Sequence, residues 1–296
     1  MKPLQAELMI LIVTIFWGSS YLFMKLGLDS LGEFNLIALR FGLAFLFAGA
    51  IFHRKFLRMS KELLSYSILL GFILFVIFTA VTFGLNTTTT SNAGFLISLT
   101  VVFVPLINTN ILKNKIEWKF IFSTAMAITG IALLTLRAPF SMRIGDLLCI
   151  VAALLYALHI IIVGYATKKV DALQLGILQL GFAGLFGLIF SLLFETPRLP
   201  NSSQGWIAIL VLSIVCSAFG FIFQVIAQKY TSPDRTGLIF SLEPVFAALF
   251  GYLFVHEVMS FKGMIGAILV FLGVVLSTTK MKYKQRNLDR GINWKN

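Results

Sequence analysis

Long apolar runs alternate with short polar stretches along the whole of this 296-residue chain. A helix that crosses a bilayer needs roughly 20 apolar residues in a row. The runs lack the ten-residue alternation of hydrophobic and polar positions that is typical of membrane β-strands. The pattern therefore predicts an all-α integral membrane protein with ten transmembrane helices. The predicted helices lie near residues 6–26, 33–52, 66–85, 91–112, 118–137, 144–166, 172–194, 205–227, 235–255 and 261–279.

The second five runs resemble the first five in sequence. Residues 36–47 align without gaps with residues 175–186, and six of the twelve positions are identical. Because five is an odd number, a second copy must enter the membrane from the opposite side. Inverted repeats around a midplane site are a common architecture of secondary transporters. We expect two inverted five-helix repeats, at residues 6–137 and 144–279, followed by a basic cytoplasmic tail at residues 280–296.

Two offsets in residue number describe the repeat. The first offset relates the first two helices of each copy, and the second offset, which is larger by four, relates the last two. The four extra residues fall in the polar loop near residues 196–203. The matched pairs are Glu7 and Asp146, Trp17 and Tyr156, Ser20 and His159, and Arg40 and Gln179 at the first offset, with Gly94 and Gly237, and Ser98 and Ser241 at the second.

The placement of the basic residues argues against a nucleic-acid partner, although the net charge is +12. Only 12% of the residues are charged, whereas a soluble domain has about 25%. With the N-terminus in the cytoplasm, 18 of the 24 Lys and Arg residues fall on the cytoplasmic side and 4 on the other. This positive-inside bias predicts a multi-pass protein of the cell (inner) membrane with both termini in the cytoplasm. The basic tail would lie beside anionic lipid.

Two prolines interrupt predicted helices. Pro105 and Pro244 each remove a helical hydrogen bond, so we expect kinks in the fourth and ninth helices. In the register of the repeat the two prolines are four residues apart, which indicates that the halves are not perfect copies.

Two charged side chains stand out because they lie inside predicted helices, where a charge costs roughly 2.5–3.5 kcal/mol and usually faces a cavity. Glu243 is a candidate for proton coupling or for binding a cationic group. Its alternative role is to accept hydrogen bonds at the break made by Pro244. Arg40 can clamp a carboxylate or phosphate. Its alternative role is to form a structural pair or to extend its apolar stem toward the membrane surface.

Neutral polar and aromatic residues complete the predicted substrate site. His159 can relay a proton or bond a substrate, or it can be a neutral His bonded across helices. Trp17, Tyr21 and Tyr156 supply aromatic faces that suit a small-molecule pocket or a cation, although aromatic residues also serve packing. The remaining candidates are Ser20, Gln179, Gln224 and Ser241.

The sequence contains no enzyme signature that we recognise. His256-Glu257 is not followed by the second His of the zinc-protease pattern, and glycine motifs for nucleotides are missing. Cys149 and Cys216 lack metal-ligand spacing. We therefore expect a protein that is not an enzyme and has no catalytic residue, metal or cofactor. The alternatives are an integral membrane transferase acting on a lipid-linked substrate and a non-transporting scaffold.

Five short motifs lie in order along the predicted helices. They are Trp17-Gly-Ser-Ser, residues 39–44, residues 241–249, His256-Glu257 and residues 263–273. Together they resemble the EamA-type transporters of the drug/metabolite transporter superfamily. One departure is Asn114, where that family usually has Glu. The resemblance implies alternating access, commonly with export of amino acids or other small metabolites. We therefore expect a secondary transporter with a midplane site between its repeats, either coupled to protons through Glu243 or uncoupled.

Overall fold

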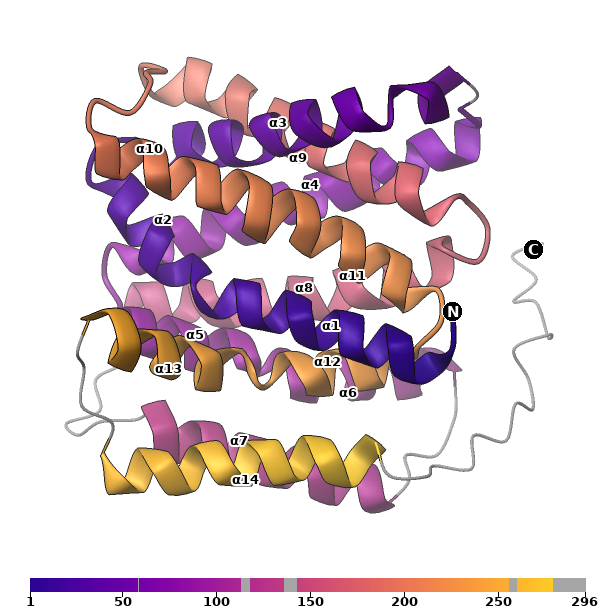
Figure 1. Cartoon of the computed structure of the whole chain (residues 1–296), viewed down its shortest axis with the longest axis vertical. Helices are drawn as coiled ribbons and strands as arrows, with labels where there is room; N and C mark the ends of the chain where they lie inside the picture. Colours follow the sequence, from indigo (N-terminus) through magenta and orange to yellow (C-terminus); the bar gives the residue numbers. More distant parts are fainter. Residues whose placement is uncertain (58, 113–117, 136–142, 256–259, 279–296) are drawn as a thin grey trace.

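A computed structural model describes most of the chain. The described residues are 1–57, 59–112, 118–135, 143–255 and 260–278. Within them the regular secondary structure is entirely helical, which confirms the predicted all-α class (Figure 1). The predicted basic tail, Asn114 and His256-Glu257 lie outside the described residues.

The helices fall on the predicted apolar runs. In chain order they are α1 (Pro3–Gly18), α2 (Ser20–Leu28), α3 (Glu33–Ile51), the short 3-10 helix η1 (His53–Leu57), α4 (Lys61–Leu85), α5 (Thr90–Ser98), α6 (Thr100–Leu112), α7 (Trp118–Thr135), α8 (Ile144–Ala166), α9 (Ala172–Phe194), α10 (Ser203–Leu210), the π-helix η2 (Val211–Phe219), α11 (Gly220–Gln228), α12 (Pro233–Phe240), α13 (Glu243–Val255) and α14 (Phe261–Thr278).

Seven helical segments of the described chain are long and apolar enough to cross a membrane. Some of them join consecutive helices, such as Pro3–Leu28, which comprises α1 and α2. Trp118–Leu134 and Phe261–Ser277 are apolar but shorter. A multi-pass membrane protein is therefore supported, while the ten-helix inverted arrangement stays a prediction.

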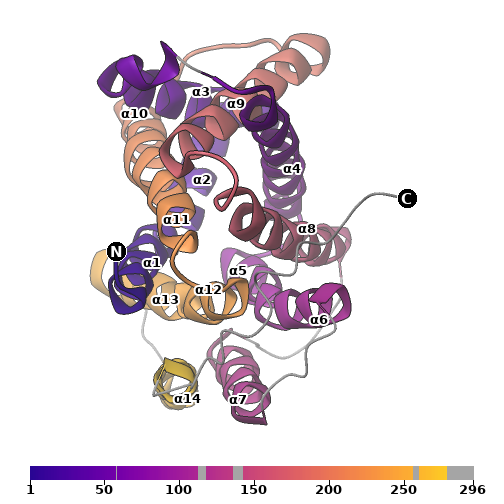
Figure 2. The same cartoon turned by 90° about the vertical axis from the view of Figure 1, so that its right-hand side faces the viewer.

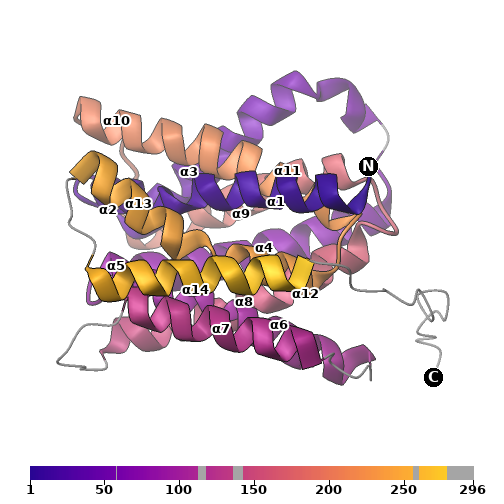
Figure 3. The same ribbon diagram turned by 60° about the horizontal axis from the view of Figure 1, so that its bottom comes forward.

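The helices run side by side in one bundle, with α7 and α14 forming a pair at its edge (Figures 1 and 2). Figure 3 shows the same pair from below, with α7 and α14 again next to each other. Large apolar side chains such as Leu46, Phe122 and Phe194 are more than half exposed on the outside. An exposed apolar surface of this kind suits contact with lipid.

Glycines bring neighbouring helices into close contact. A Cβ atom added to Gly184 on α9 would lie 2.6 Å from the backbone nitrogen of Gly42 on α3. A Cβ atom on Gly130 of α7 would lie 2.5 Å from the carbonyl oxygen of Gly266 on α14. Side chains larger than hydrogen would therefore push these pairs apart, as expected where packing rather than the hydrophobic effect joins helices in lipid.

Two of the apolar runs are broken at corresponding positions. The break between α5 and α6 centres on Leu99, and the break between α12 and α13 centres on Leu242, its match at the second offset. At both, the leucine N–H donates three residues back, to Leu96 and Ile239 respectively. Both leucine carbonyls accept from the residues three and four positions ahead. The two breaks therefore share one backbone hydrogen-bond pattern.

The prolines relate differently to these breaks. Pro244 is the second residue of α13, directly after the break, as the predicted kink in the ninth helix requires. Pro105 lies inside α6, and the interruption in that run comes six residues earlier, at Leu99. Side-chain hydroxyl groups accompany this earlier break, since Ser98 donates to the Gly94 carbonyl and Thr100 to the Ile97 carbonyl. Such local bonds compete with the regular helical pattern.

Candidate functional site

A cavity lies in the middle of the bundle, where the α1–α2 junction meets α4, α8, α11 and α13. It offers about 40 Å³ to the centres of water molecules. One water needs about 10–15 Å³ by the same measure, so the cavity holds a few waters and is too small for a metabolite. The lining residues are Trp17, Ser20, Tyr21, Met24, Arg40, Ile77, Phe78, Val81, Ile97, Tyr156, Phe221 and Glu243.

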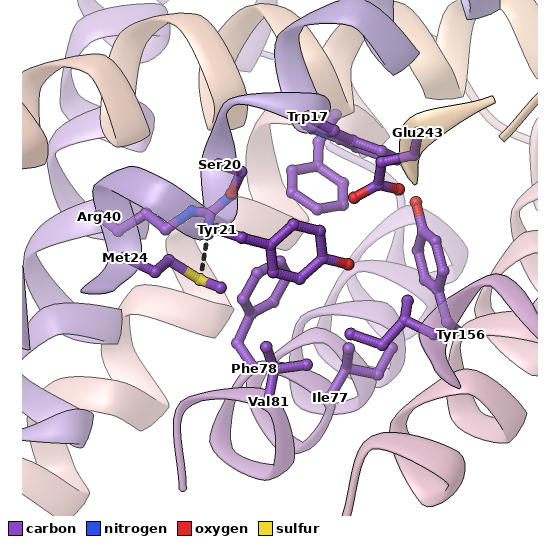
Figure 4. Close-up of a pocket in the computed structure, with 12 residues that line it drawn as sticks. Trp17, Ser20, Tyr21, Met24, Arg40, Ile77, Phe78, Val81, Tyr156 and Glu243 are labelled. Atoms are coloured by element: carbon purple, nitrogen blue, oxygen red, sulfur yellow. Dashed lines mark hydrogen bonds between the residues drawn. The ribbon is translucent and has the colours of Figure 1, made fainter. Parts of the chain in front are cut away.

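Glu243 reaches the cavity because of the helix break. It is the first residue of α13, and its side chain is 9% exposed. The Glu243 carboxylate and the hydroxyl groups of Tyr21 and Tyr156 point toward the same part of the cavity (Figure 4). The hydroxyl group of Tyr156 has no hydrogen-bond partner within the described chain. The Glu243 carboxylate and the Tyr156 hydroxyl group can therefore receive a cation, an ammonium group or water.

Arg40 enters the cavity from α3 and is 1% exposed. Its Nε donates to Ser217 Oγ at 2.7 Å, and its Nη1 lies 3.2 Å from Met24 Sδ. The guanidinium carbon lies 4.3 Å from the ring centre of Phe78, which adds a cation–π contact. In the described residues neither Arg40 nor Glu243 forms an ion pair. The cavity thus brings one guanidinium group and one carboxyl group together without a direct ion pair between them.

The π-helix η2 holds two of these side chains in place. Trp17 Nε1 donates to the Cys216 carbonyl at 2.7 Å, and Arg40 donates to the next residue, Ser217. A π-helix changes the spacing of backbone groups and is frequent at functional sites. A Cβ atom on Gly220 would lie 2.6 Å from Trp17 Nε1, so a glycine is needed beside the indole. The sequence patterns used above do not detect this π segment.

An aromatic wall surrounds Trp17. Its ring centre lies 4.9 Å from those of Phe221 and Phe240 and 5.9 Å from that of Tyr156. Phe78 completes the wall at 6.0 Å from Phe221. Stacked and tilted aromatic pairs stabilise each other beyond simple burial, so this side of the cavity is apolar and well packed.

The structure gathers six of the ten predicted site residues around this cavity. They are Trp17, Ser20, Tyr21, Arg40, Tyr156 and Glu243. Ser241 lines a smaller adjoining cavity of about 10 Å³, to which Tyr156 and Glu243 also contribute. Because its hydroxyl donates to the Leu238 carbonyl at 2.6 Å, Ser241 also closes the end of α12.

The other three predicted residues lie in the core beside the cavity. His159 Nε2 and Gln179 Oε1 are 3.0 Å apart, and both residues are fully buried. Gln224 Nε2 donates to Gln228 Oε1 at 3.0 Å. None of the three lines the cavity in this conformation. For His159 the contact with Gln179 on the next helix is the one that its alternative role, a His bonded across helices, requires.

Some lining residues were missed from the sequence although a signal for them existed. Phe78 and Phe221 are separated by the second offset, at which the ends of the two repeats match. They are identical, and both line the cavity. Extending that offset to the third and eighth helices would have found them. Met24 carries no comparable signal, since a Met in an apolar helix is usually a packing residue.

The fold and the site together define a class. A multi-pass helical membrane protein with a central cavity that carries buried charges and an aromatic wall has the architecture of a membrane transporter.

Comparison with known proteins leads to the same class and to a family. The sequence profile of the EamA-like transporter family matches residues 4–136 and 143–279. The chain belongs to this family. It is 27% identical to an uncharacterized transporter of Archaeoglobus fulgidus over 95% of this chain and 88% of that protein. It is 25% identical to the uncharacterized transporter YoaV of Bacillus subtilis, over 91% and 95% of the two chains.

A solved crystal structure of a protein has the same fold. It superposes with a TM-score of 0.79, covers 93% of this chain and 96% of its own, and shares 18% sequence identity. At this identity the likeness concerns the fold alone.

Proposed function

We propose that this protein is a secondary transporter that exports a small zwitterionic metabolite, such as an amino acid, across the cell membrane. In this proposal ten transmembrane helices form two inverted five-helix repeats, with both termini in the cytoplasm. The repeats rock about the central cavity, so that the cavity opens to one side of the membrane at a time.

One observation carries the proposed substrate class. Arg40 comes from the first predicted repeat and Glu243 from the second. Both line the cavity, and neither forms a direct ion pair within the described chain. Burying an unpaired charge is costly, so an arrangement of this kind is expected where a ligand supplies the opposite charges. A zwitterion brings a carboxylate for Arg40 and an ammonium group for Glu243.

The other lining residues suit an amphipathic substrate. Trp17, Phe78 and Phe221 offer apolar and π surfaces to its side chain. The guanidinium group of Arg40 is held by Ser217, which orients its remaining donors. Because the cavity of about 40 Å³ is smaller than a metabolite, loading requires that helices on one side move apart. The described conformation therefore corresponds to a closed state in the proposed cycle.

Glu243 also provides a means of proton coupling. A carboxylate that binds either a ligand or a proton, but not both at once, can couple the movement of the ligand to that of the proton. In uncoupled facilitation the same side chain would bind the substrate alone. The pH dependence of transport distinguishes these two mechanisms.

An integral membrane transferase is the second candidate. It requires reactive side chains at a membrane face, whereas Glu243 and Arg40 are enclosed in the middle of the bundle. A non-transporting scaffold has no use for unpaired charges in its core. Both candidates are therefore weaker explanations of the cavity than transport.

The test combines binding with flux. The purified protein is heated with a panel of amino acids and related zwitterions, beside compounds that lack the carboxylate or the ammonium group. A ligand at 100 times its dissociation constant stabilises the folded protein by about 2.7 kcal/mol. We expect stabilisation only by zwitterions, followed by uptake of the same compound into inverted vesicles. Stabilisation by none of them, or equally by the one-charge analogues, would rule out the zwitterionic class.

A further inference from the structure

An ion pair joins two helices at the end of the bundle where the chain begins. The carboxylate of Glu7 on α1 accepts a hydrogen bond from Arg235 on α12. The side chains are only 7% and 17% exposed, so water has little access to the pair. It connects the first predicted repeat to the second, and neither residue lines the central cavity. We name Glu7 and Arg235 the first latch.

A second connection lies at the opposite end of the bundle, where α5 begins (Figure 1). The carboxylate of Asp146 on α8 accepts hydrogen bonds from Asn92 Nδ2 at 2.6 Å and from Thr88 Oγ1 at 2.5 Å. Its other oxygen accepts from the Arg143 backbone at 2.7 Å. Here α8 belongs to the second repeat and α5 to the first. We name Asp146, Asn92 and Thr88 the second latch.

The two latches occupy the same positions of the two repeats. Glu7 and Asp146 are related by the first offset, which matches the first helices. Asn92 and Arg235 are related by the second offset, which matches the fourth helices. Each partner lies three residues after a helix cap, since Thr89 caps α5 by accepting from Asn92 and Ser232 caps α12 by accepting from Arg235.

The same contact is therefore made twice, between the first helix of one repeat and the fourth helix of the other, at opposite ends of the bundle. Chance pairing of surface groups does not produce four residues in matched register with matched helix caps. A symmetric transporter needs such a pair, because the structure that closes one side must have a counterpart that closes the other.

We propose that the two latches are the gates of this protein. The first latch opens when the cavity opens toward the N-terminal end, and the second opens when it opens toward the other end. This inference rests on alternating access in the proposed function. It adds the residues that hold each side closed, which lie outside the substrate site.

The latches differ in charge. The first pairs a cation with an anion, whereas the second joins a carboxylate to neutral donors. Both contain hydrogen bonds to an ionised group, which are stronger than bonds between neutral groups.

The experiment measures access to the cavity from each side without a substrate. Cys149 and Cys216 are replaced by Ala, and Val81, which lines the cavity, is replaced by Cys. A membrane-impermeant thiol reagent is applied to either face of vesicles in which the full chain has a known orientation. The rate of modification at position 81 from each face reports how often the cavity opens to that face.

Two matched variants test the two latches. With Glu7→Gln we expect modification from the N-terminal face to accelerate roughly tenfold, because a bond between charges is weakened. With Asp146→Asn we expect the acceleration from the opposite face. The charge exchange Glu7→Arg with Arg235→Glu should restore the parent rate. Arg235→Lys is the milder variant if Glu7→Gln does not fold, and it should accelerate modification from the N-terminal face as well.

Acceleration from the wrong face, or no change in folded variants, would overturn the proposal. A charge exchange that folds but does not restore the parent rate would also overturn it. Because no substrate is present, these outcomes are independent of the zwitterion test. The latch proposal can thus be contradicted while zwitterion binding is confirmed, and the binding proposal can be contradicted while the latches are shown to control access.

Discussion

The helix break between α5 and α6 and the break between α12 and α13 have the same backbone and different chemistry. Thr100 is the first residue after one break, and Glu243, its match at the second offset, is the first residue after the other. Thr100 Oγ1 donates to the Ile97 carbonyl at 2.7 Å and to the Ala153 carbonyl at 3.1 Å. The Thr100 side chain therefore bonds within its own helical run and to α8, whereas the Glu243 carboxyl group lines the central cavity.

The second helices of the two predicted repeats show the same contrast. Arg40 lines the cavity and bonds only part of its guanidinium group to the protein. Gln179, its counterpart, bonds to His159 and lies away from the cavity. In these two matched pairs, one member bonds within the protein and the other brings an ionisable side chain to the central cavity. Positions that correspond in the predicted repeats can therefore share a backbone arrangement and still differ in which one lines the cavity.

Glu243→Gln, which removes the ionisable group at one of the two breaks, is expected to have the largest effect on transport. The amide keeps the volume of the side chain but can neither hold a proton nor pair with an ammonium group. Transport should fall roughly 10- to 100-fold, because a bond to a charged group is lost in a buried site. The remaining flux should be independent of pH between about pH 6 and pH 8 in a proton-coupled protein. Both are measured as flux in vesicles.

The control for this variant is Glu62→Gln. Glu62 forms an exposed ion pair with Lys169, and surface pairs contribute little. It should transport as the parent protein does. If Glu243→Gln retains both the rate and the pH profile of the parent, Glu243 has a structural role like that of Thr100.

Arg40→Gln makes the first repeat resemble the second at this position. The stabilisation by a saturating zwitterion, about 2.7 kcal/mol at 100 times the dissociation constant, should disappear in thermal unfolding. Gln179→Met is the matched change in the other repeat. It leaves the buried His159 Nε2 without its partner, which should cost about 1–3 kcal/mol of stability, and it should leave the ligand effect in place. Loss of the ligand effect in Gln179→Met instead would place that residue in the site, as the sequence predicts.

Gly220→Ala tests the contact between η2 and Trp17. The added methyl group would lie 2.6 Å from the indole nitrogen, so the ring must shift and lose its bond to the Cys216 carbonyl. We expect a loss of stability of about 1–3 kcal/mol together with weaker ligand binding. Gly49→Ala is the control, because no atom lies within 4 Å of its added Cβ. It should be neutral or stabilise by up to about 1 kcal/mol. Equal effects in the two variants would contradict the close contact.

Thr100→Val should have the smallest effect. The valine keeps the shape and removes two hydrogen bonds to carbonyl groups, so the free energy of unfolding should fall by about 1 kcal/mol. Transport and its pH profile should not change, in contrast to Glu243→Gln at the matched position. A variant of Thr100 that alters the pH profile would show that both breaks take part in coupling.

Part of the candidate site could be predicted because charged residues are rare and costly inside membrane helices. Arg40 and Glu243 stand out for this reason, and both line the cavity. His159 and Gln224 are also predicted site residues, yet they are bonded within the core. Polarity at a given depth does not tell which way a helix face is turned. That orientation depends on contacts between helices that are distant in sequence.

The order of residues along the chain is enough to predict a helical membrane protein, because each apolar run is a local property with a fixed length requirement. It also gives the residues that correspond between the predicted repeats, because they follow from aligning one half of the chain with the other. The three-dimensional arrangement was needed to locate the break in the fourth run at Leu99 rather than at Pro105 and to find the π-helix that bonds Trp17 and Arg40. It was also needed to find the Glu7–Arg235 and Asn92–Asp146 contacts at opposite ends of the bundle. These features arise from packing between distant helices, where a side chain's partner is set by the three-dimensional arrangement and not by its neighbours along the chain.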